Sequence, residues 1–202
     1  MRIRPVPRRF YRRDSPSVAP ELLNKILVCG NRVGRIVEVE AYAGAADAAS
    51  HGFRGRTRRN ATMFGEAGRL YVYFTYGMHW CANVVCGVEG EAGAVLLRAL
   101  APVKGVDEMR AGRPAARHER DLCSGPGKLC QALGISGTHD GADVVAGREG
   151  IRILDDGTVP PSSPEQGPRI GISVANEVPW RWWVPGDVNV SRHRGPRRRL
   201  PD

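Results

Sequence analysis

The sequence predicts a single domain of the α+β class over residues 1–202, on three observations. With 42% apolar residues, a chain of this length can bury one sizeable core, so one domain is the default. Segments with strand-like alternation dominate the first half, and helical patterns come mainly later, which is typical of α+β proteins. The two ends, about residues 1–8 and 193–202, are rich in Arg and Pro and are expected to be loose.

The first elements are a helix and a long strand. Ser17 can cap a short helix over residues 17–27, which carries an apolar stripe, and a turn at residues 29–31 leads into a strand over residues 33–42. Residues 43–68 form a long polar connection. A connection of this length inside a small domain is often functional.

More strands and two helices follow the connection. In the next strand Tyr71, Tyr73 and Thr75 alternate with apolar residues, and a turn at Gly77 leads to its antiparallel partner. The elements expected here are strands over residues 69–75, 80–85, 94–99, 151–154 and 169–174 and helices over residues 102–111 and 125–133.

The charge of the chain is strongly positive. A formal net charge of +9 and an isoelectric point near 9.9 favour a polyanionic partner such as nucleic acid. Most of the positive residues are arginines, which form bidentate contacts with phosphate and guanine. A GC-rich genome would also enrich a protein in arginine, so the charge alone leaves both explanations open.

Several classes of function lack the motifs they need. The cysteines form no C-x-x-C pair, and His118-Glu119 lacks the second histidine of a zinc protease, so no metal is expected. Neither a dinucleotide-binding glycine motif behind a strand nor a P-loop occurs. We find no signal peptide and no apolar run of about 20 residues, so we expect a cytoplasmic protein without membrane spans.

Two carboxylates share one face of the strand over residues 33–42. Because side chains alternate along a strand, Glu38, Glu40 and Tyr42 lie together, and the apolar residues lie on the other face. Adjacent carboxylates repel one another, and enclosure of this face would shift the pKa of at least one of them. A solvated strand face and a catalytic carboxylate are the two alternatives.

Aromatic residues are dense around the same strands. Core packing explains most such clusters. The alternative is a pocket that stacks a base flipped out of duplex DNA, beside a side chain wedged into the duplex. A side chain at the tip of the predicted hairpin, just before Gly77, projects outward and does not suit a core. The residues concerned are Tyr42, His51, Tyr71, Tyr73, Trp80 and, at the hairpin tip, Tyr76.

With a base in such a pocket, Glu40 is the candidate general base. It would activate a water against the anomeric carbon and stabilise the cation-like sugar of the transition state. No lysine near this face is an obvious Schiff-base nucleophile. Hydrolysis by water, without cleavage of the DNA strand, is therefore the simpler expectation.

A glycine-rich loop, Ser124-Gly125-Pro126-Gly127-Lys128, stands at the start of the second expected helix. Backbone N–H groups at a helix start can bind phosphate. A plain helix-entry loop has the same composition, so both alternatives stay open. The candidate contacts to a DNA backbone in this loop are Ser124, Gly127 and Lys128.

Six motifs occur in one order along the chain. They are VEAY at residues 39–42, His51, LYVYFTYGM at residues 70–78, Asn83, LLRAL at residues 96–100 and LCSGPGKL at residues 122–129. In this order they resemble the alkyladenine (3-methyladenine, or methylpurine) DNA glycosylase family. The resemblance extends over about residues 9–192, and six motifs in order are far more specific than any one of them.

The resemblance implies a single α+β domain around a curved antiparallel β-sheet with flanking helices, and no metal or cofactor. It implies a monofunctional DNA glycosylase, which flips an alkylated or otherwise damaged purine from duplex DNA and hydrolyses its N-glycosidic bond with an activated water, starting base excision repair. The implied partner is double-stranded DNA with a damaged purine. We expect a monomer, located in the cytoplasm at the nucleoid.

The resemblance also implies roles for single residues. Glu40 matches the catalytic base, and Arg98 and the backbone carbonyl of Ile170 match groups that hold the nucleophilic water. Asn83 matches a residue that crowds the 2-amino group of guanine, and the His51 backbone N–H matches a group that contacts the purine 6-position. The walls of the base pocket are Tyr42, His51 and Tyr73, and the residues that fill the gap in the duplex are Tyr76 and, beside it, Met78.

The chain departs from the family pattern in one segment. Many relatives have Thr-Pro-Arg-Asn-Arg before Met-Phe, whereas residues 57–61 here are Thr-Arg-Arg-Asn-Ala. Ala61 lacks the arginine that would contact a phosphate, and Arg58 is a candidate substitute. Arg58 and Arg59 are the backbone contacts expected here. His79-Trp80 is bulkier than a wedge flank requires.

Two other functions remain as alternatives. A non-catalytic binder of distorted DNA would need Tyr76 and the basic face but not Glu40. A hydrolase of free nucleosides would bind without the steep salt dependence of phosphate contacts. The range of damaged bases (3-methyladenine, 7-methylguanine, hypoxanthine, ethenoadenine) depends on the pocket around Asn83 and Tyr42, and the sequence offers no unambiguous general acid for neutral bases.

Overall fold

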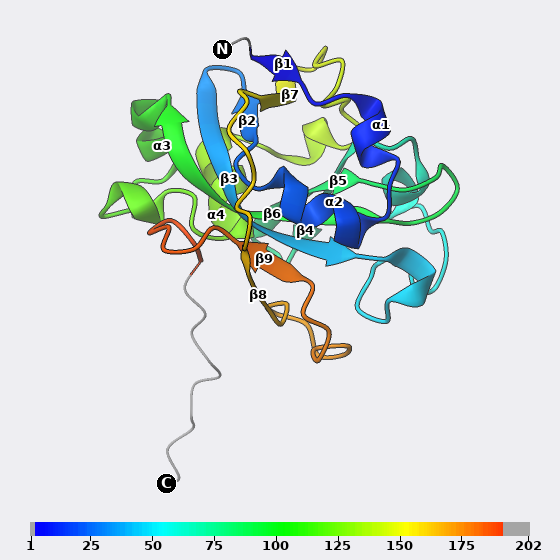
Figure 1. Ribbon diagram of the computed structural model, residues 1–202. Coiled ribbons are helices and arrows are strands. Elements are labelled where there is room, and N and C mark those ends of the chain that lie inside the picture. The colour runs from blue at the N-terminus through cyan, green and yellow to red at the C-terminus, as the bar shows by residue number, and fades with distance from the viewer. Residues whose placement is uncertain (1–2, 192–202) are drawn as a thin grey trace, which may run out of the picture.

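A curled antiparallel β-sheet forms the framework of the protein in the computed structural model, which describes residues 3–191 (Figure 1). Seven of its nine strands are hydrogen-bonded in the order β1-β7-β2-β3-β6-β5-β4, and β9 pairs with both β3 and β8. The expected α+β class with a curved antiparallel sheet and flanking helices is confirmed. The strands are β1 (Arg4–Pro5), β2 (Ile26–Cys29), β3 (Arg32–Tyr42), β4 (Leu70–Thr75), β5 (His79–Val85), β6 (Ala94–Lys104), β7 (Ile151–Asp155), β8 (Glu165–Gly167) and β9 (Arg181–Trp183).

The long strands β3 and β6 pair at the centre of the sheet, and β9 lies along β3 (Figure 1). Register shifts interrupt the β3–β6 ladder on both sides of Glu38. Such irregularities bend a strand and increase its twist. From Ile36 to Ala41 the strand is buried on both faces. The carboxylate face of β3 is therefore enclosed, and the alternative of a solvated face is wrong.

Short helices cover the sheet. Helix α2 packs against β3 and β6, and α4 packs against β5 and β6. Between them the apolar faces of the strands form one large core, with a small second cluster around Met63 and Tyr71. The helices are α1 (Arg8–Tyr11), α2 (Ser15–Leu22), α3 (Val106–Gly112) and α4 (Pro126–Leu133), and the 3-10 turns are η1 (Gly44–Ala46), η2 (Ala61–Phe64), η3 (Glu119–Asp121) and η4 (Gly137–His139).

The strands expected over residues 33–42, 69–75, 80–85, 94–99 and 151–154 and the helix over residues 125–133 are confirmed to within a few residues, although β6 runs on to Lys104. The first helix begins and ends earlier than expected. The side chain of Asp14, not Ser17, caps it by accepting a hydrogen bond from the Ser17 N–H. Asn24, with a φ of 67°, turns the chain, so that Ile26 belongs to β2 instead.

Two other elements differ from expectation. Residues 102–104 extend β6, and α3 begins only after Gly105, whose left-handed φ of 73° marks the end of the strand. The strand expected over residues 169–174 is wrong, because the segment is irregular and runs through several bends. Its polar groups bond elsewhere: the Ile170 N–H donates to Glu40 and the Arg169 guanidinium to Asp47.

The N-terminal end is more ordered than expected. Arg4 and Pro5 form β1, which pairs with β7, and the Val6 N–H donates to the carbonyl of Ile153. The expectation of a loose segment over residues 1–8 is therefore wrong for residues 4–6, because hydrogen bonds to the sheet edge fix them. The other expected loose end, residues 193–202, lies outside the described residues. Among residues 3–191 no helix is both long and apolar enough to span a membrane.

The bulky pair His79 and Trp80 packs against two glycines. A Cβ on Gly127 would lie 2.9 Å from the His79 ring, and a Cβ on Gly137 would lie 2.7 Å from the Trp80 ring. Both glycines therefore leave room that these side chains fill. The pair fixes the β4–β5 hairpin against the start of α4 and the η4 turn, which accounts for its size.

Candidate active site

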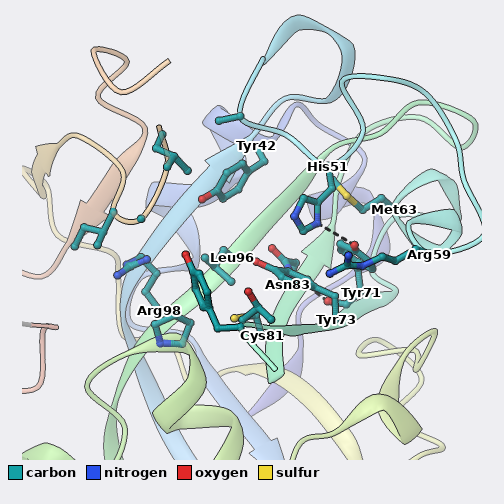
Figure 2. Close-up of a pocket in the computed structure, with 17 residues that line it drawn as sticks. Tyr42, His51, Arg59, Met63, Tyr71, Tyr73, Cys81, Asn83, Leu96 and Arg98 are labelled. Carbon is teal, nitrogen blue, oxygen red and sulfur yellow. Dashed lines mark hydrogen bonds between the residues drawn. The ribbon is translucent and has the colours of Figure 1, made fainter. Parts of the chain in front are cut away.

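A cavity of about 380 Å³ opens at the end of the sheet where β3, β4, β5 and β6 meet the connection over residues 43–68 (Figure 2). Its volume and mixed lining suit a small, flat, partly polar ligand. Aromatic and arginine side chains surround it. The lining includes eight residues to which the sequence analysis gave a site role: Tyr42, His51, Arg59, Tyr73, Tyr76, Asn83, Arg98 and Ile170.

Glu40 lies behind this lining, on β3, with its side chain fully buried. Its Oε1 accepts a hydrogen bond of 2.7 Å from the Ile170 N–H and lies 3.1 Å from Nη1 of Arg98. Its Oε2 accepts one of 2.9 Å from the Tyr42 hydroxyl. Every oxygen of the carboxylate is thus oriented by a donor. The Ile170 group that contacts Glu40 is the N–H, and the expected contact of its carbonyl with the nucleophilic water stays a prediction.

Arg98 joins two buried carboxylates. Its Nε donates to Oε1 of Glu38 over 2.9 Å, while Nη1 faces Glu40. Burial alone lowers the pKa of Arg98, but Glu40 and Glu38 together raise it, so the guanidinium stays charged. The Glu38 pKa shows the converse balance: burial raises it, and Arg98, Ser191 and Arg181 bring it below its usual value. The expectation that at least one carboxylate of this face has a shifted pKa is confirmed for Glu38.

Tyr42 is held from two sides. Its hydroxyl bonds Glu40, and the Arg169 guanidinium stacks over its ring with 4.8 Å between Cζ and the ring centroid. Arg169 is itself paired with Asp47, and both side chains are buried. This pair ties the connection that follows β3 to the segment near Ile170. Burial raises the pKa of Tyr42 far above its usual value, with the nearby Glu40 adding to the effect, so the ring remains neutral.

His51, Tyr71 and Tyr73 form the opposite wall. The His51 and Tyr73 rings meet edge to face at 4.5 Å, Tyr71 and Tyr73 stack at 5.4 Å, and Nδ1 of His51 lies 3.0 Å from the Tyr71 hydroxyl (Figure 2). The Asn60 amide bonds the His51 carbonyl and so fixes the loop. Burial, and next the positive charge of Arg59, lower the pKa of His51, so its ring is neutral near pH 7.

Asn83 lies on β5 at the cavity floor. It is buried, and its Nδ2 donates to the carbonyl of Tyr71 over 3.2 Å. The amide is therefore fixed in one orientation toward the cavity. This placement agrees with the predicted role of a residue that limits the shape of the bound base, a role that stays a prediction.

Tyr76 and Met78 lie at the tip of the β4–β5 hairpin and are exposed to 78% and 67%. Tyr76 adopts a left-handed φ of 51° and Gly77 one of 66°, which are the angles of a tight hairpin turn. A left-handed conformation strains a tyrosine by about 1–3 kcal/mol. Tyr76 also lines the cavity mouth, so a strained, exposed aromatic ring stands beside the pocket.

The residues expected to contact the DNA backbone surround the cavity unequally. Arg59 lines it and donates to the Phe74 carbonyl, whereas Arg58 is exposed and outside the lining. Pro126 of the glycine-rich loop lines the cavity too. In that loop Lys128 Nζ donates to Ser124 Oγ over 3.3 Å at the start of α4, where Gly127 adjoins His79.

The sequence did not reveal the long-range contacts of five further charged or polar residues around the site. Their contacts join segments that are more than 100 residues apart in the sequence, except for Glu38 and Arg98, which are 60 residues apart. The five residues are Glu38, Asp47, Arg169, Arg181 and Ser191. A single sequence carries no signal for such pairs. Of the five, Glu38 alone drew notice, through its place beside Glu40. Within residues 3–191 no group of three or more His, Cys, Asp and Glu could hold a metal ion.

The sequence profile of the methylpurine-DNA glycosylase family matches residues 9–188. Similar curated proteins share the name "Putative 3-methyladenine DNA glycosylase". One, from Burkholderia orbicola (strain MC0-3), is 59% identical over 92% of this chain and 90% of its own length. Others are from Rhodopseudomonas palustris (strain HaA2), 50% identical over 93% and 90%, and from Streptomyces avermitilis, 46% identical over 96% and 95%.

The fold and the cavity, taken with these matches, define a hydrolase of N-glycosyl bonds that acts in DNA repair. The chain belongs to the methylpurine-DNA glycosylase family. The resemblance noted in the sequence is thereby confirmed over nearly the whole chain.

Proposed function

We propose that this chain is a monofunctional glycosylase of duplex DNA that flips out an alkylated or otherwise damaged purine and hydrolyses its N-glycosidic bond with a water activated by Glu40. The observation that carries the proposal is the buried Glu40 carboxylate. Arg98, Tyr42 and the Ile170 N–H orient it directly behind the lining of a cavity of base size.

The reaction needs one water and one proton acceptor. The Tyr42 hydroxyl lies 2.9 Å from Oε2 of Glu40, and a water in that position can give its proton to the carboxylate. The water oxygen bonds to the anomeric carbon as the N-glycosidic bond breaks, and the bonding electron pair leaves with the purine. The products are the free base and an abasic deoxyribose. Glu40 also stabilises the cation-like sugar of the transition state.

The pocket walls favour a cationic purine such as 3-methyladenine. Tyr42 and Tyr73 have a pKa raised mainly by burial, and His51 has one lowered by burial and Arg59, so all three rings are neutral. Neutral aromatic faces attract a cationic ring between them. A purine alkylated at a ring nitrogen leaves as a neutral base and needs no general acid, whereas a neutral base such as hypoxanthine must be protonated as it leaves.

Tyr76 is the proposed wedge, with Met78 beside it. Its position beside the cavity mouth would let its ring enter the stack as a purine swings into the pocket. Arg58, Arg59 and the loop with Ser124, Gly127 and Lys128 are the proposed phosphate contacts. The proposal includes a monomeric protein in the cytoplasm at the nucleoid, without metal or cofactor.

Product analysis tests the proposal directly. After incubation with a duplex carrying one 3-methyladenine or hypoxanthine, we expect free base and an unbroken strand that contains an abasic site. Borohydride should trap no covalent complex, because no lysine forms a Schiff base. A trapped complex or a spontaneously cleaved strand would refute the monofunctional mechanism.

Base release and the salt dependence of binding separate the glycosylase from its two alternatives. Tyr76→Ala should weaken binding to damaged duplex and slow base release, and binding by the unaltered protein should weaken steeply as salt rises. A pure binder of distorted DNA would release no base from any duplex. Release from free nucleosides with no salt dependence would favour the nucleoside hydrolase.

A further inference from the structure

Glu38 is a buried carboxylate that accepts four hydrogen bonds, yet the proposed reaction does not use it. Oε1 accepts hydrogen bonds from Arg98 Nε (2.9 Å), Arg181 Nε (2.7 Å) and Ser191 Oγ (2.8 Å), and Oε2 accepts one from the Ser191 N–H (2.7 Å). The side chain is fully buried. The donors come from β6, β9 and the last described residues of the chain.

Arg98 distributes its charge between two acceptors. Nε bonds Glu38, Nη1 faces Glu40 at 3.1 Å, and Nη2 donates to Ser191 Oγ at 3.4 Å. With Arg181 on the far side of Glu38, the cluster holds two carboxylates and two guanidiniums and is formally neutral. Arg181 is kept in place by stacking over the Trp183 ring at 4.3 Å.

We propose that Glu38 is the positioning residue of this site: it fixes the Arg98 guanidinium and takes up part of its charge, so that Arg98 orients Glu40 without neutralising it as a base. The inference rests on the proposed role of Glu40. A buried ion cluster is rarely more stable than apolar residues of the same volume. We therefore expect the cluster to affect the geometry and charge at Glu40 rather than the stability of the protein.

The other charged or titratable groups around Glu40 are Tyr42, Tyr73, Cys81 and Arg169. Burial raises the pKa of the two tyrosines and of Cys81 above their usual values, and Arg169 is paired with Asp47. These groups keep one charge state between about pH 4 and 8. The distribution of the Arg98 charge is thus the variable that a change at Glu38 alters.

The test is single-turnover base release from an alkylated duplex as a function of pH. In Glu38→Gln, Arg98 turns fully to Glu40, whose carboxylate becomes harder to protonate and a weaker base. We expect the plateau rate to fall about tenfold or more. The midpoint of the acidic limb should move down by about one pH unit.

Arg181→Met should move the same midpoint in the opposite direction. Met keeps the apolar stem over Trp183, but the cluster gains a net negative charge and Glu38 draws Arg98 away from Glu40. The Glu40 carboxylate then becomes easier to protonate, and the midpoint rises by about one pH unit. A merely structural cluster would lower the rate at every pH and move neither midpoint.

Two further variants are the controls. Glu21→Gln changes the net charge equally at an exposed pair with Arg13 and should leave rate and midpoint unaltered. Glu38→Asp keeps the negative charge on a shorter side chain. The rate should therefore fall, while the midpoint of the acidic limb should not change. Thermal melting identifies any variant that fails to fold. If Glu38→Gln does not fold, the rates and midpoints of Glu38→Asp and Arg181→Met test the inference instead.

Unmoved midpoints, or midpoints that move in the same direction in Glu38→Gln and Arg181→Met, would overturn the inference. A shifted midpoint in Glu38→Asp would also overturn it. Failure of the inference is distinguishable from failure of the proposed function. If the unaltered protein releases no base, the proposed function itself fails, whereas normal release with unshifted variants contradicts the role of Glu38 alone.

Discussion

The Tyr42 hydroxyl donates a hydrogen bond of 2.9 Å to Oε2 of Glu40, so one residue both lines the cavity and covers the carboxylate. The Ile170 N–H and Arg98 hold Oε1, and Glu40 is fully buried. In the proposed reaction, a nucleophilic water that gives its proton to Oε2 would need the place of this hydroxyl. We infer that the hydroxyl and the water exchange places before the bond to the base breaks.

Tyr42→Phe should therefore accelerate base release. The variant keeps the ring under Arg169 but removes the hydrogen bond that has to break, and a gain of about 1 kcal/mol corresponds to about fivefold in rate. Single-turnover kinetics at neutral pH measure it. Tyr42→Leu, which also removes the ring, should slow release. Slower release by Tyr42→Phe would show that the hydroxyl takes part in the chemistry.

His51 should titrate below its ordinary value. Burial and Arg59 lower its pKa, so Arg59→Met should raise the pKa toward the usual value of about 6.5. NMR titration of the imidazole measures both values. Because the unfolded chain binds the proton first, His51 reduces stability as the pH falls through 6.5 toward the folded pKa. An unchanged pKa in Arg59→Met would mean that burial alone causes the shift.

The pair between Asp47 and Arg169 should be essential for the stability of the site. Asp47→Asn leaves a buried guanidinium without its counter-ion, which costs about 3–5 kcal/mol. Urea unfolding should show this loss, and Asp47→Asn combined with Arg169→Gln should recover part of it. A loss below about 1 kcal/mol would mean that solvent reaches the guanidinium.

Tyr76→Asn should stabilise the protein while impairing it. Asparagine tolerates the left-handed conformation that strains Tyr76, so the free energy of unfolding should rise by up to about 1 kcal/mol. Binding to damaged duplex should weaken, because the proposed wedge is gone. Binding that is unchanged in a stabilised variant would remove Tyr76 from the account of base flipping.

Local patterns predicted the part of the site that follows from alternation along one strand. The alternation of β3 placed Glu38, Glu40 and Tyr42 on one face, and the glycine after Tyr76 marked the hairpin tip. Both signals depend on neighbours in the sequence, and the structure agrees with them.

The parts of the fold and site that the sequence did not predict depend on long-range contacts. The prediction of a strand over residues 169–174 was wrong because Arg169 and Ile170 bond to residues more than 100 positions away rather than to a neighbouring strand. Their partners are Asp47 and Glu40. The cage around Glu38 depends on Arg181 and Ser191 in the same way. Helix ends also shifted, because Asp14 and Ser17 are both acceptable caps by residue type and packing selects between them.

Single-turnover base release by the unaltered protein and by Glu40→Gln, from a duplex with one 3-methyladenine, tests the central claim most directly. Gln keeps the size of the side chain but cannot accept a proton, so release should fall by at least about a hundredfold. Binding to the damaged duplex should stay within a few-fold. Release by Glu40→Gln at the rate of the unaltered protein would contradict the assignment of Glu40 as the catalytic base.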